Sequence, residues 1–352
     1  MQKMFEIDDV QKVRSLPIEL WPVADRAAWQ AARQPRERLR RGGAASHLKA
    51  ITFADLGRRY GYFLDFLVRS GTLALEAPPA AQVTPANVEG FLTELRSRVG
   101  SVTQHGTIYK LRRAAKLLDP TCDLDWLMEI ETDLALVMQP RSKADQLVLA
   151  ERLVEAGLTL VEAAILSSGM SETAKARQVR NGLMIAILAL HPIRLKNFAS
   201  LEIDRNFIET DGAWWIALKA SETKEKRPDE REVDAMILPA LRVYLERHRP
   251  VLLRSETNAL WISSNRGEAL SYGGMEAAIA EATRSTVGIG LGAHMFRTAA
   301  ASSAAIHVGD NPHLGSALLH HRDRRITNKH YNFASSLSSS EKLGNLIRKG
   351  LD

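Results

Sequence analysis

The first apolar pattern of the chain predicts a helix between Thr52 and Gly71. Its apolar residues recur at roughly helical spacing, and Thr52 is followed by Asp55 three positions later, as in a capping box. A second helix is expected from Thr84-Pro85 to Gly100, because Thr is a good N-cap residue and Pro favours the first helical position. Both helices have start and stop signals of their own.

The next apolar stripe, at Ile108, Leu111 and Leu118, predicts a third helix with its basic residues facing outward. It should end near residues 119–120, where Asp precedes Pro. The three helices predict an all-helical N-terminal domain over residues 49–140.

A second domain is expected over residues 145–352, after a linker around 134–145. Helices near residues 145–168 open it. Residues 178–190 are apolar nearly all round, which is typical of a fully buried helix, and His191-Pro192 should end it.

A small antiparallel sheet is expected to interrupt this helical domain. Strands at residues 206–210 and 213–219 flank Asp211-Gly212, a strong hairpin turn signal, and residues 233–238 supply a third strand. The predicted fold class is mainly α with a small antiparallel β-sheet. Further helices are expected at residues 239–248, from Ser271, within residues 291–307, and from Asn311-Pro312 to about His321.

Composition narrows the function classes. The 352 residues contain 45% hydrophobic and 25% charged residues, which indicates a globular chain with room for two domains. The sequence lacks an apolar run long enough for a membrane span and a signal-peptide pattern, so no membrane contact is expected and the protein should be cytoplasmic. The single cysteine, Cys122, excludes an internal disulfide.

The net charge of +6 makes an anionic partner plausible, and the clustering of the charges is more telling than their sum. Residues 1–48 are expected to form a basic, partly ordered arm, in which Trp21 and Trp29 indicate some packed structure. The residues expected to contact DNA are Arg38, Arg40 and Arg41 of this arm and Lys110, Arg112, Arg113 and Lys116 of the third helix.

The residues that could carry chemistry lie in the second half of the chain. His294 and Arg297 are three positions apart, so they share one face of a helical turn and could present two donors to one anion. Arg194 follows the buried helix, Lys224 lies in the loop SETKEKRPDER after the second strand, His321 lies in LLHHRD, and Tyr331 lies in ITNKHYN.

In order, spacing and structural context, this set resembles the tyrosine recombinase family, also called phage integrases, over roughly residues 145–352. The resemblance implies a catalytic set of Arg194, Lys224, His294, Arg297, His321 and the nucleophile Tyr331. Two positions depart from the family pattern: Asn197 stands where many members have an acidic residue, and His320 replaces the Gly that commonly precedes the second His. His320 is therefore an alternate for His321, and Lys226 or Lys219 for Lys224.

The family resemblance implies that double-stranded DNA is the partner and that a helical core-binding domain and a catalytic domain close on it. It also implies a homo-tetramer on two recombination sites and leaves accessory DNA-bending proteins open as partners. Cleavage through a tyrosine would need no cofactor and no metal. The alternatives are a relaxing type IB topoisomerase and a non-catalytic DNA-binding protein that keeps the fold.

Overall fold

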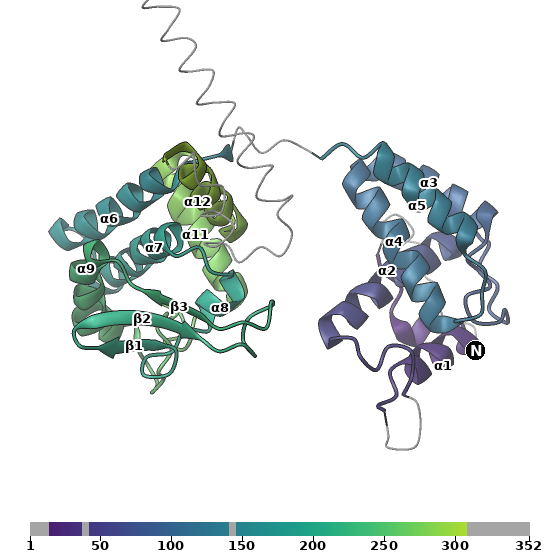
Figure 1. The fold of residues 1–352 in the computed structure, drawn as a ribbon, viewed down its shortest axis with the longest axis horizontal. Coiled ribbons are helices and arrows are strands. Elements are labelled where there is room, and N and C mark those ends of the chain that lie inside the picture. The colour runs from purple at the N-terminus through teal and green to yellow at the C-terminus, as the bar shows by residue number, and fades with distance from the viewer. Residues whose placement is uncertain (1–13, 37–41, 141–145, 308–352) are drawn as a thin grey trace, which may run out of the picture. The chain divides into compact units, whose positions relative to one another are not determined.

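The computed structural model describes residues 14–36, 42–140 and 146–307, which form two compact units, residues 1–142 and 143–352. Both units are mostly helical, and unit 2 contains a small antiparallel sheet (Figure 1). The mainly α fold class expected from the sequence is therefore confirmed. Within the described residues, each helix is too short or too polar to cross a membrane.

Unit 1 is a helical bundle around an aromatic-rich core. Trp21 and Trp29 lie in this core, in edge-to-face contact with ring centroids 5.4 Å apart, so the residues before the first predicted helix pack into the same unit. The helices of unit 1 are α1 (Val23–Ala32), α2 (Ala50–Arg69), α3 (Pro85–Arg98), α4 (Ser101–Leu118) and α5 (Asp125–Leu136).

Of the two helix starts predicted from capping residues in unit 1, one is confirmed and one is wrong. The hydroxyl of Thr84 accepts a hydrogen bond from the backbone N–H of Asn87, so the predicted N-cap of α3 is confirmed. The predicted capping box at Thr52 is wrong, because α2 begins two residues earlier and Asp55 instead forms ion pairs with Arg58 and Lys110.

Unit 2 is built around α7 (Glu172–Leu190), in which residues 179–189, about three turns, are buried on all sides, as the continuous apolar run predicts. A π-helical turn, Tyr244–His248, joins α9 and α10 into one helical segment against α7. The helices that surround α7 are α6 (Ala150–Leu166), α9 (Leu238–Val243), α10 (Arg249–Leu252), α11 (Tyr272–Val287) and α12 (Ala293–His307).

Helices α6 and α7 bring their backbones into close contact at Gly157 and Gly182. A Cβ atom on Gly182 would lie 2.5 Å from the carbonyl oxygen of Gly157, and one on Gly157 would lie 2.6 Å from the carbonyl oxygen of Gly182. The two backbones can approach this far only because neither residue has a side chain.

The sheet has the strand order β1 (Phe207–Thr210), β2 (Ala213–Leu218), β3 (Asp229–Glu232), with antiparallel pairing throughout. The hairpin turn predicted at Asp211-Gly212 is confirmed, since both residues have positive φ values of 53° and 79°. Trp214 lies on the buried face of β2 and Trp215 on the more exposed face.

The third strand was predicted at the wrong residues. It comprises Asp229–Glu232, and Val233 is followed by a 3₁₀ turn, Ala235–Ile237, capped by the Asp234 side chain. The alternation of β3 concerns charged rather than apolar residues: Asp229 and Arg231 stand opposite Leu218 and Ile216 on the buried face, whereas Glu230 and Glu232 face outward. Charged residues on the inner face of a strand have no hydrophobic pattern to reveal them.

We predict that Gly182→Ala destabilises unit 2 by about 1–3 kcal/mol, because the added methyl group must push α6 and α7 apart. Urea unfolding combined with hydrogen exchange of the α7 amides measures the loss. Gly273→Ala is the matched control, since a Cβ at Gly273 meets nothing within 4 Å in the described structure and should leave unit 2 as stable or slightly more stable. Equal stability of the two variants would contradict the close helix contact.

Candidate active site

Arg194 is placed by the abrupt end of α7. His191 and Pro192 stop that helix, Ile193 is buried, and Arg194 adopts an extended backbone conformation as the N-cap residue of the short helix α8 (Leu195–Ala199). Its guanidinium therefore leaves the core at the point where the chain changes direction. Its side chain remains 32% exposed.

Arg297 reaches the same place from the first turns of α12. It is only 8% exposed, and its Nη1 donates a hydrogen bond to the carbonyl oxygen of Pro192. The segment that sets the position of Arg194 thus also orients Arg297. His294, one turn earlier on the same helix, is exposed and is not among the residues around the pocket described below.

The loop between β2 and β3 closes over these arginines. The Thr223 hydroxyl donates to the carbonyl oxygen of Arg227 (2.6 Å) and accepts from the N–H of Arg227 (3.1 Å), which draws the loop into a compact turn. Lys224 and Lys226 lie in this turn and are both exposed, and Lys226 has a positive φ of 54°. Lys219, at the end of β2, is also exposed.

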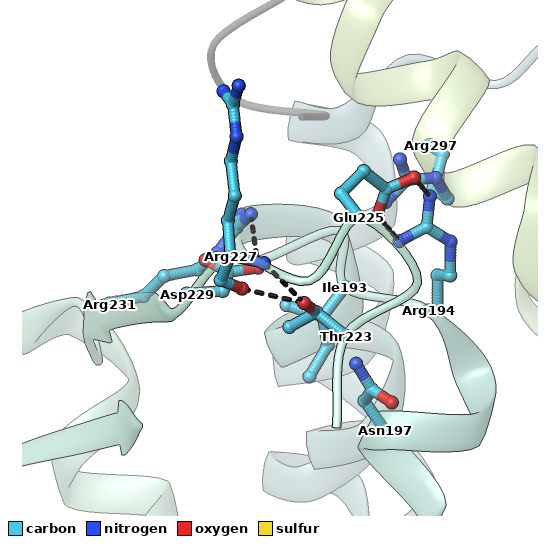
Figure 2. A pocket seen from close by; sticks show the side chains of 9 residues that line it. All are labelled: Ile193, Arg194, Asn197, Thr223, Glu225, Arg227, Asp229, Arg231 and Arg297. Atoms are coloured by element: carbon cyan, nitrogen blue, oxygen red, sulfur yellow. Dashed lines mark hydrogen bonds and ion pairs between the residues drawn. The ribbon is translucent and has the colours of Figure 1, made fainter. Parts of the chain in front are cut away.

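A small, strongly charged pocket lies between the loop, β3 and the two arginines (Figure 2). Its volume is about 10 Å³, room for about one water molecule. The pocket is lined by Ile193, Arg194, Asn197, Thr223, Glu225, Arg227, Asp229, Arg231 and Arg297. Four arginines and two acidic residues thus line one site, although the guanidinium of Arg227 extends away from it in Figure 2.

Glu225 is the direct partner of Arg194. Both of its carboxylate oxygens accept hydrogen bonds from the Nη1 and Nη2 atoms of Arg194, a bidentate ion pair visible in Figure 2. Partial burial acts to raise the pKa of the Glu225 carboxyl, but the hydrogen bonds and charge of Arg194 outweigh it, so this pKa is lowered. Glu225 is therefore ionised at neutral pH.

The electrostatic environment of Arg297 is unfavourable to its own charge. Burial, together with the like charges of Arg194 and Arg231, lowers the pKa of Arg297 to about 10, against the opposing effect of Glu225 and Asp229. Arg297 is still protonated at neutral pH. An additional anion beside it would relieve this repulsion, which is what a site for a phosphate group requires.

Sequence reasoning missed three contributors to this site. Glu225 directly follows Lys224 in the charged loop, and the Asp229–Arg231 ion pair (2.7 Å) comes from the strand that was misplaced. The third is His191, whose Nε2 accepts the backbone N–H of Asp234 (3.3 Å) and so ties the Arg194 segment to the end of the sheet. No spacing rule marks Glu225 or His191, since each is defined by a contact between segments distant in the chain.

The other predicted functional residues lie either outside the described residues or on α4 of unit 1. His320, His321 and Tyr331, as well as Arg38, Arg40 and Arg41, lie outside the described residues. On α4, Lys110 pairs with Asp55, Arg112 pairs with Glu131, Arg113 stacks on Tyr109, and Lys116 donates to the carbonyl oxygen of Cys122.

Two tyrosines of unit 2 that do not line the pocket lie in different environments. Tyr244 is fully buried, and its hydroxyl donates to the carbonyl oxygen of Leu260, so it is a packing residue. Tyr272 is exposed on α11, whose N-cap Ser271 accepts the N–H of Gly274. In the part of the chain that the structure describes, no three His, Cys, Asp or Glu side chains are grouped so as to hold a metal ion.

The sequence matches the model of the phage integrase family over residues 162–336, a range that includes every candidate catalytic residue from Arg194 to Tyr331. The chain belongs to the phage integrase family. No curated protein matches this phage integrase family member in sequence.

Two solved structures share the fold of this family member. One is the XerH site-specific recombinase bound to its difH substrate before cleavage, with 18% identity, a TM-score of 0.55, and coverage of 82% of this chain and 78% of XerH. The other is XerH bound to a palindromic difH substrate after cleavage, with 17% identity, a TM-score of 0.54, and coverage of 80% and 75%. At this identity, the likeness shows the tyrosine recombinase fold.

We predict that acidification destabilises unit 2 in part through His191. Burial, reinforced by the charge of Arg231, lowers the pKa of folded His191 to about 4 from the ordinary value of 6.5. Between these two values the unfolded chain binds a proton that the folded chain does not, so stability falls as the pH drops through this window, by roughly 1–3 kcal/mol.

Urea unfolding at pH 7, 6, 5 and 4 measures this dependence. The control is His191→Gln, which keeps an acceptor for the N–H of Asp234 but does not titrate, and its stability should fall less with pH than that of the wild type. Parallel curves for the two proteins would show that His191 is not the responsible group.

Proposed function

We propose that this phage integrase family member is a site-specific DNA recombinase that cuts and rejoins duplex DNA through a 3′-phosphotyrosyl intermediate, for the integration or excision of a mobile element. The observation that carries the proposal is the convergence of Arg194 and Arg297 at one pocket, from the end of α7 and the start of α12. The placement of Lys224 in the loop beside them supports it.

The two arginines suit a phosphodiester as substrate. Charge develops on the non-bridging phosphate oxygens during attack, and planar guanidinium groups donate to such oxygens in pairs. The Pro192 carbonyl already orients Arg297, so that little reorganisation is needed on its side.

In the proposed reaction, the Tyr331 hydroxyl attacks the phosphorus, a new P–O bond forms to the tyrosine, and the bond to the 5′ oxygen breaks. The phenolic proton leaves with the help of His294, and Lys224, with Lys226 as its alternate, supplies a proton to the departing 5′ oxygen. His321, or its alternate His320, donates to the phosphate. Reversal by a 5′ hydroxyl rejoins DNA with no ATP, cofactor or metal.

The two units suggest a division of labour. Unit 1, with the basic arm over residues 1–48 and the core-binding domain over residues 49–140, would hold the DNA, and the catalytic domain over residues 145–352 would cut it. XerH was solved bound to a DNA substrate, which supports double-stranded DNA as the partner here. A homo-tetramer on two sites is the expected assembly.

We predict that the wild-type protein forms a covalent adduct with a nicked suicide DNA substrate, and that Tyr331→Phe forms none, because Phe lacks the attacking oxygen. Denaturing gel electrophoresis of labelled DNA detects the adduct. Tyr272→Phe is the matched control, since it removes the hydroxyl of an exposed tyrosine on α11 and should leave the adduct unchanged.

Each outcome of the adduct experiment bears on the proposal. An adduct that survives in Tyr331→Phe would show that the nucleophile is another residue. Binding of DNA by the wild type without any adduct on its own site would favour the non-catalytic DNA-binding protein. Adduct formation with relaxation of supercoiled DNA, but without joining of two sites, would favour the topoisomerase.

We further predict that deletion of residues 337–352 abolishes tetramer assembly on paired sites and leaves weak DNA binding intact. The prediction is based on the apolar stripe of Leu337, Leu343, Leu346 and Ile347, which could dock on a neighbouring protomer. Sizing of the protein–DNA complex by analytical ultracentrifugation measures the assembly state. Intact synapsis after the deletion would contradict the proposed exchange of this segment.

A further inference from the structure

The carboxylate of Glu225 makes the kind of contact that a phosphate would make with Arg194. Its two oxygens accept from Nη1 and Nη2, so both terminal nitrogens of the guanidinium are engaged along one face. Carboxylates and phosphates are both recognised by the guanidinium fork through paired, parallel hydrogen bonds. As the structure has it, Arg194 is therefore engaged by an internal anion.

The space around this pair is too small for a second anion. The pocket holds about 10 Å³, room for about one water molecule, whereas a phosphate group has four oxygens around phosphorus. Figure 2 shows Glu225 reaching toward Arg194, with Arg297 beside Arg194. A phosphate can meet both arginines only if the Glu225 side chain moves.

Glu225 lies in a compact turn of the loop between β2 and β3. Thr223 and Arg227 clasp the base of the turn, and Glu225 lies between them, next to Lys224. A change confined to this turn would release Arg194 and at the same time shift Lys224, the candidate proton donor. Release of the arginine and placement of the lysine would then be one event.

The charges of the residues around the pocket also favour Glu225 as the group that a phosphate would displace. The pocket is lined by four arginines, Arg194, Arg227, Arg231 and Arg297, and by two acidic residues, Glu225 and Asp229. Asp229 accepts two hydrogen bonds from Arg231, of 2.7 and 3.1 Å. Glu225 is thus the carboxylate that stands directly against Arg194. Without the negative charge of Glu225, Arg194 and Arg297 would bind an external anion more tightly.

We propose that Glu225 is an internal competitor for the DNA phosphate, which holds Arg194 until a phosphate displaces it and the β2–β3 loop rearranges. This inference rests on the proposed function in assigning Arg194 and Arg297 to the phosphate. Glu225 acts through Arg194 and is a positioning residue. It keeps the site closed to anions that cannot also move the loop.

The test uses the full-length protein and inorganic sulfate, a tetrahedral anion whose charge is constant over the working pH range. Sulfate is titrated into protein with isotope-labelled arginine, and the Nε–H resonance of Arg194 is followed by nuclear magnetic resonance, with Arg194→Lys used to assign it. Glu225→Gln, which has the same shape but no charge, should bind sulfate about tenfold more tightly than the wild type.

The matched control is Glu222→Gln. Glu222 lies in the same loop, is also part-buried, and carries the same charge, but it pairs with Arg205 at 2.7 Å rather than with Arg194. This variant changes the net charge equally and should bind sulfate within about twofold of the wild type. Glu225→Asp, which keeps the carboxylate, should also stay close to the wild type.

Tighter sulfate binding in Glu225→Gln, but not in the two control variants, supports the role of Glu225 as a competitor. Equal or weaker sulfate binding in Glu225→Gln, with a retained thermal unfolding transition, overturns it and means that Glu225 instead supports Arg194. Similar gains in the Glu222 and Glu225 variants also overturn it, since they would reflect net charge only.

A second measurement follows the reaction itself. Glu225→Gln should form the covalent adduct faster than the wild type at subsaturating DNA and at a similar rate at saturating DNA, because competition affects binding. An equal loss of the adduct-formation rate at both DNA concentrations would contradict the role of Glu225 as a competitor. If no protein forms an adduct, the recombinase proposal fails, whereas the sulfate comparison still decides the role of Glu225.

Discussion

The site depends on one electrostatic constraint: two guanidinium groups of the same charge are held together in a half-buried pocket. Arg194 contributes to the lowered pKa of Arg297, so the pair is costly unless anions stand beside it. Glu225 and Asp229 meet that requirement from the loop and from β3. Much of the arrangement around the pocket follows from this need to keep arginines close together and still neutralise them.

The scaffold satisfies the constraint through rigid elements. The second half of α7 is buried on all sides and packs against α6 at the Gly157–Gly182 contact, so its end is a fixed point from which Arg194 emerges. The Pro192 carbonyl couples that end to Arg297 on α12, and the His191 contact with Asp234 couples it to the sheet. In such a site, the side chains left to move are those of the β2–β3 loop. The loop itself is held to the sheet at its two ends.

Membership of the phage integrase family and the fold shared with XerH give this geometry a chemical context. In the proposed reaction, Arg194 and Arg297 of this pocket would hold the non-bridging oxygens of the phosphodiester. The pocket also contains a carboxylate in the position of an anionic ligand. Under the proposed function, displacement of Glu225 by a phosphate would link the entry of substrate to a change in the loop that carries the candidate proton donor.

The sequence alone determined the elements with local signals: the buried α7, the Thr84 cap, the Asp211-Gly212 turn and the family to which the chain belongs. These rest on periodicity and on backbone preferences of single residues, which neighbouring residues suffice to express. The order of candidate residues also placed Arg194 and Arg297 in one site before any fold was known. Tertiary structure alone decided the place of β3, the internal partners of the α4 basic residues, and the roles of Glu225 and His191. Most of these depend on contacts between segments far apart in the chain, where a polar or charged group is partly buried against a distant partner, and no local pattern encodes that partner.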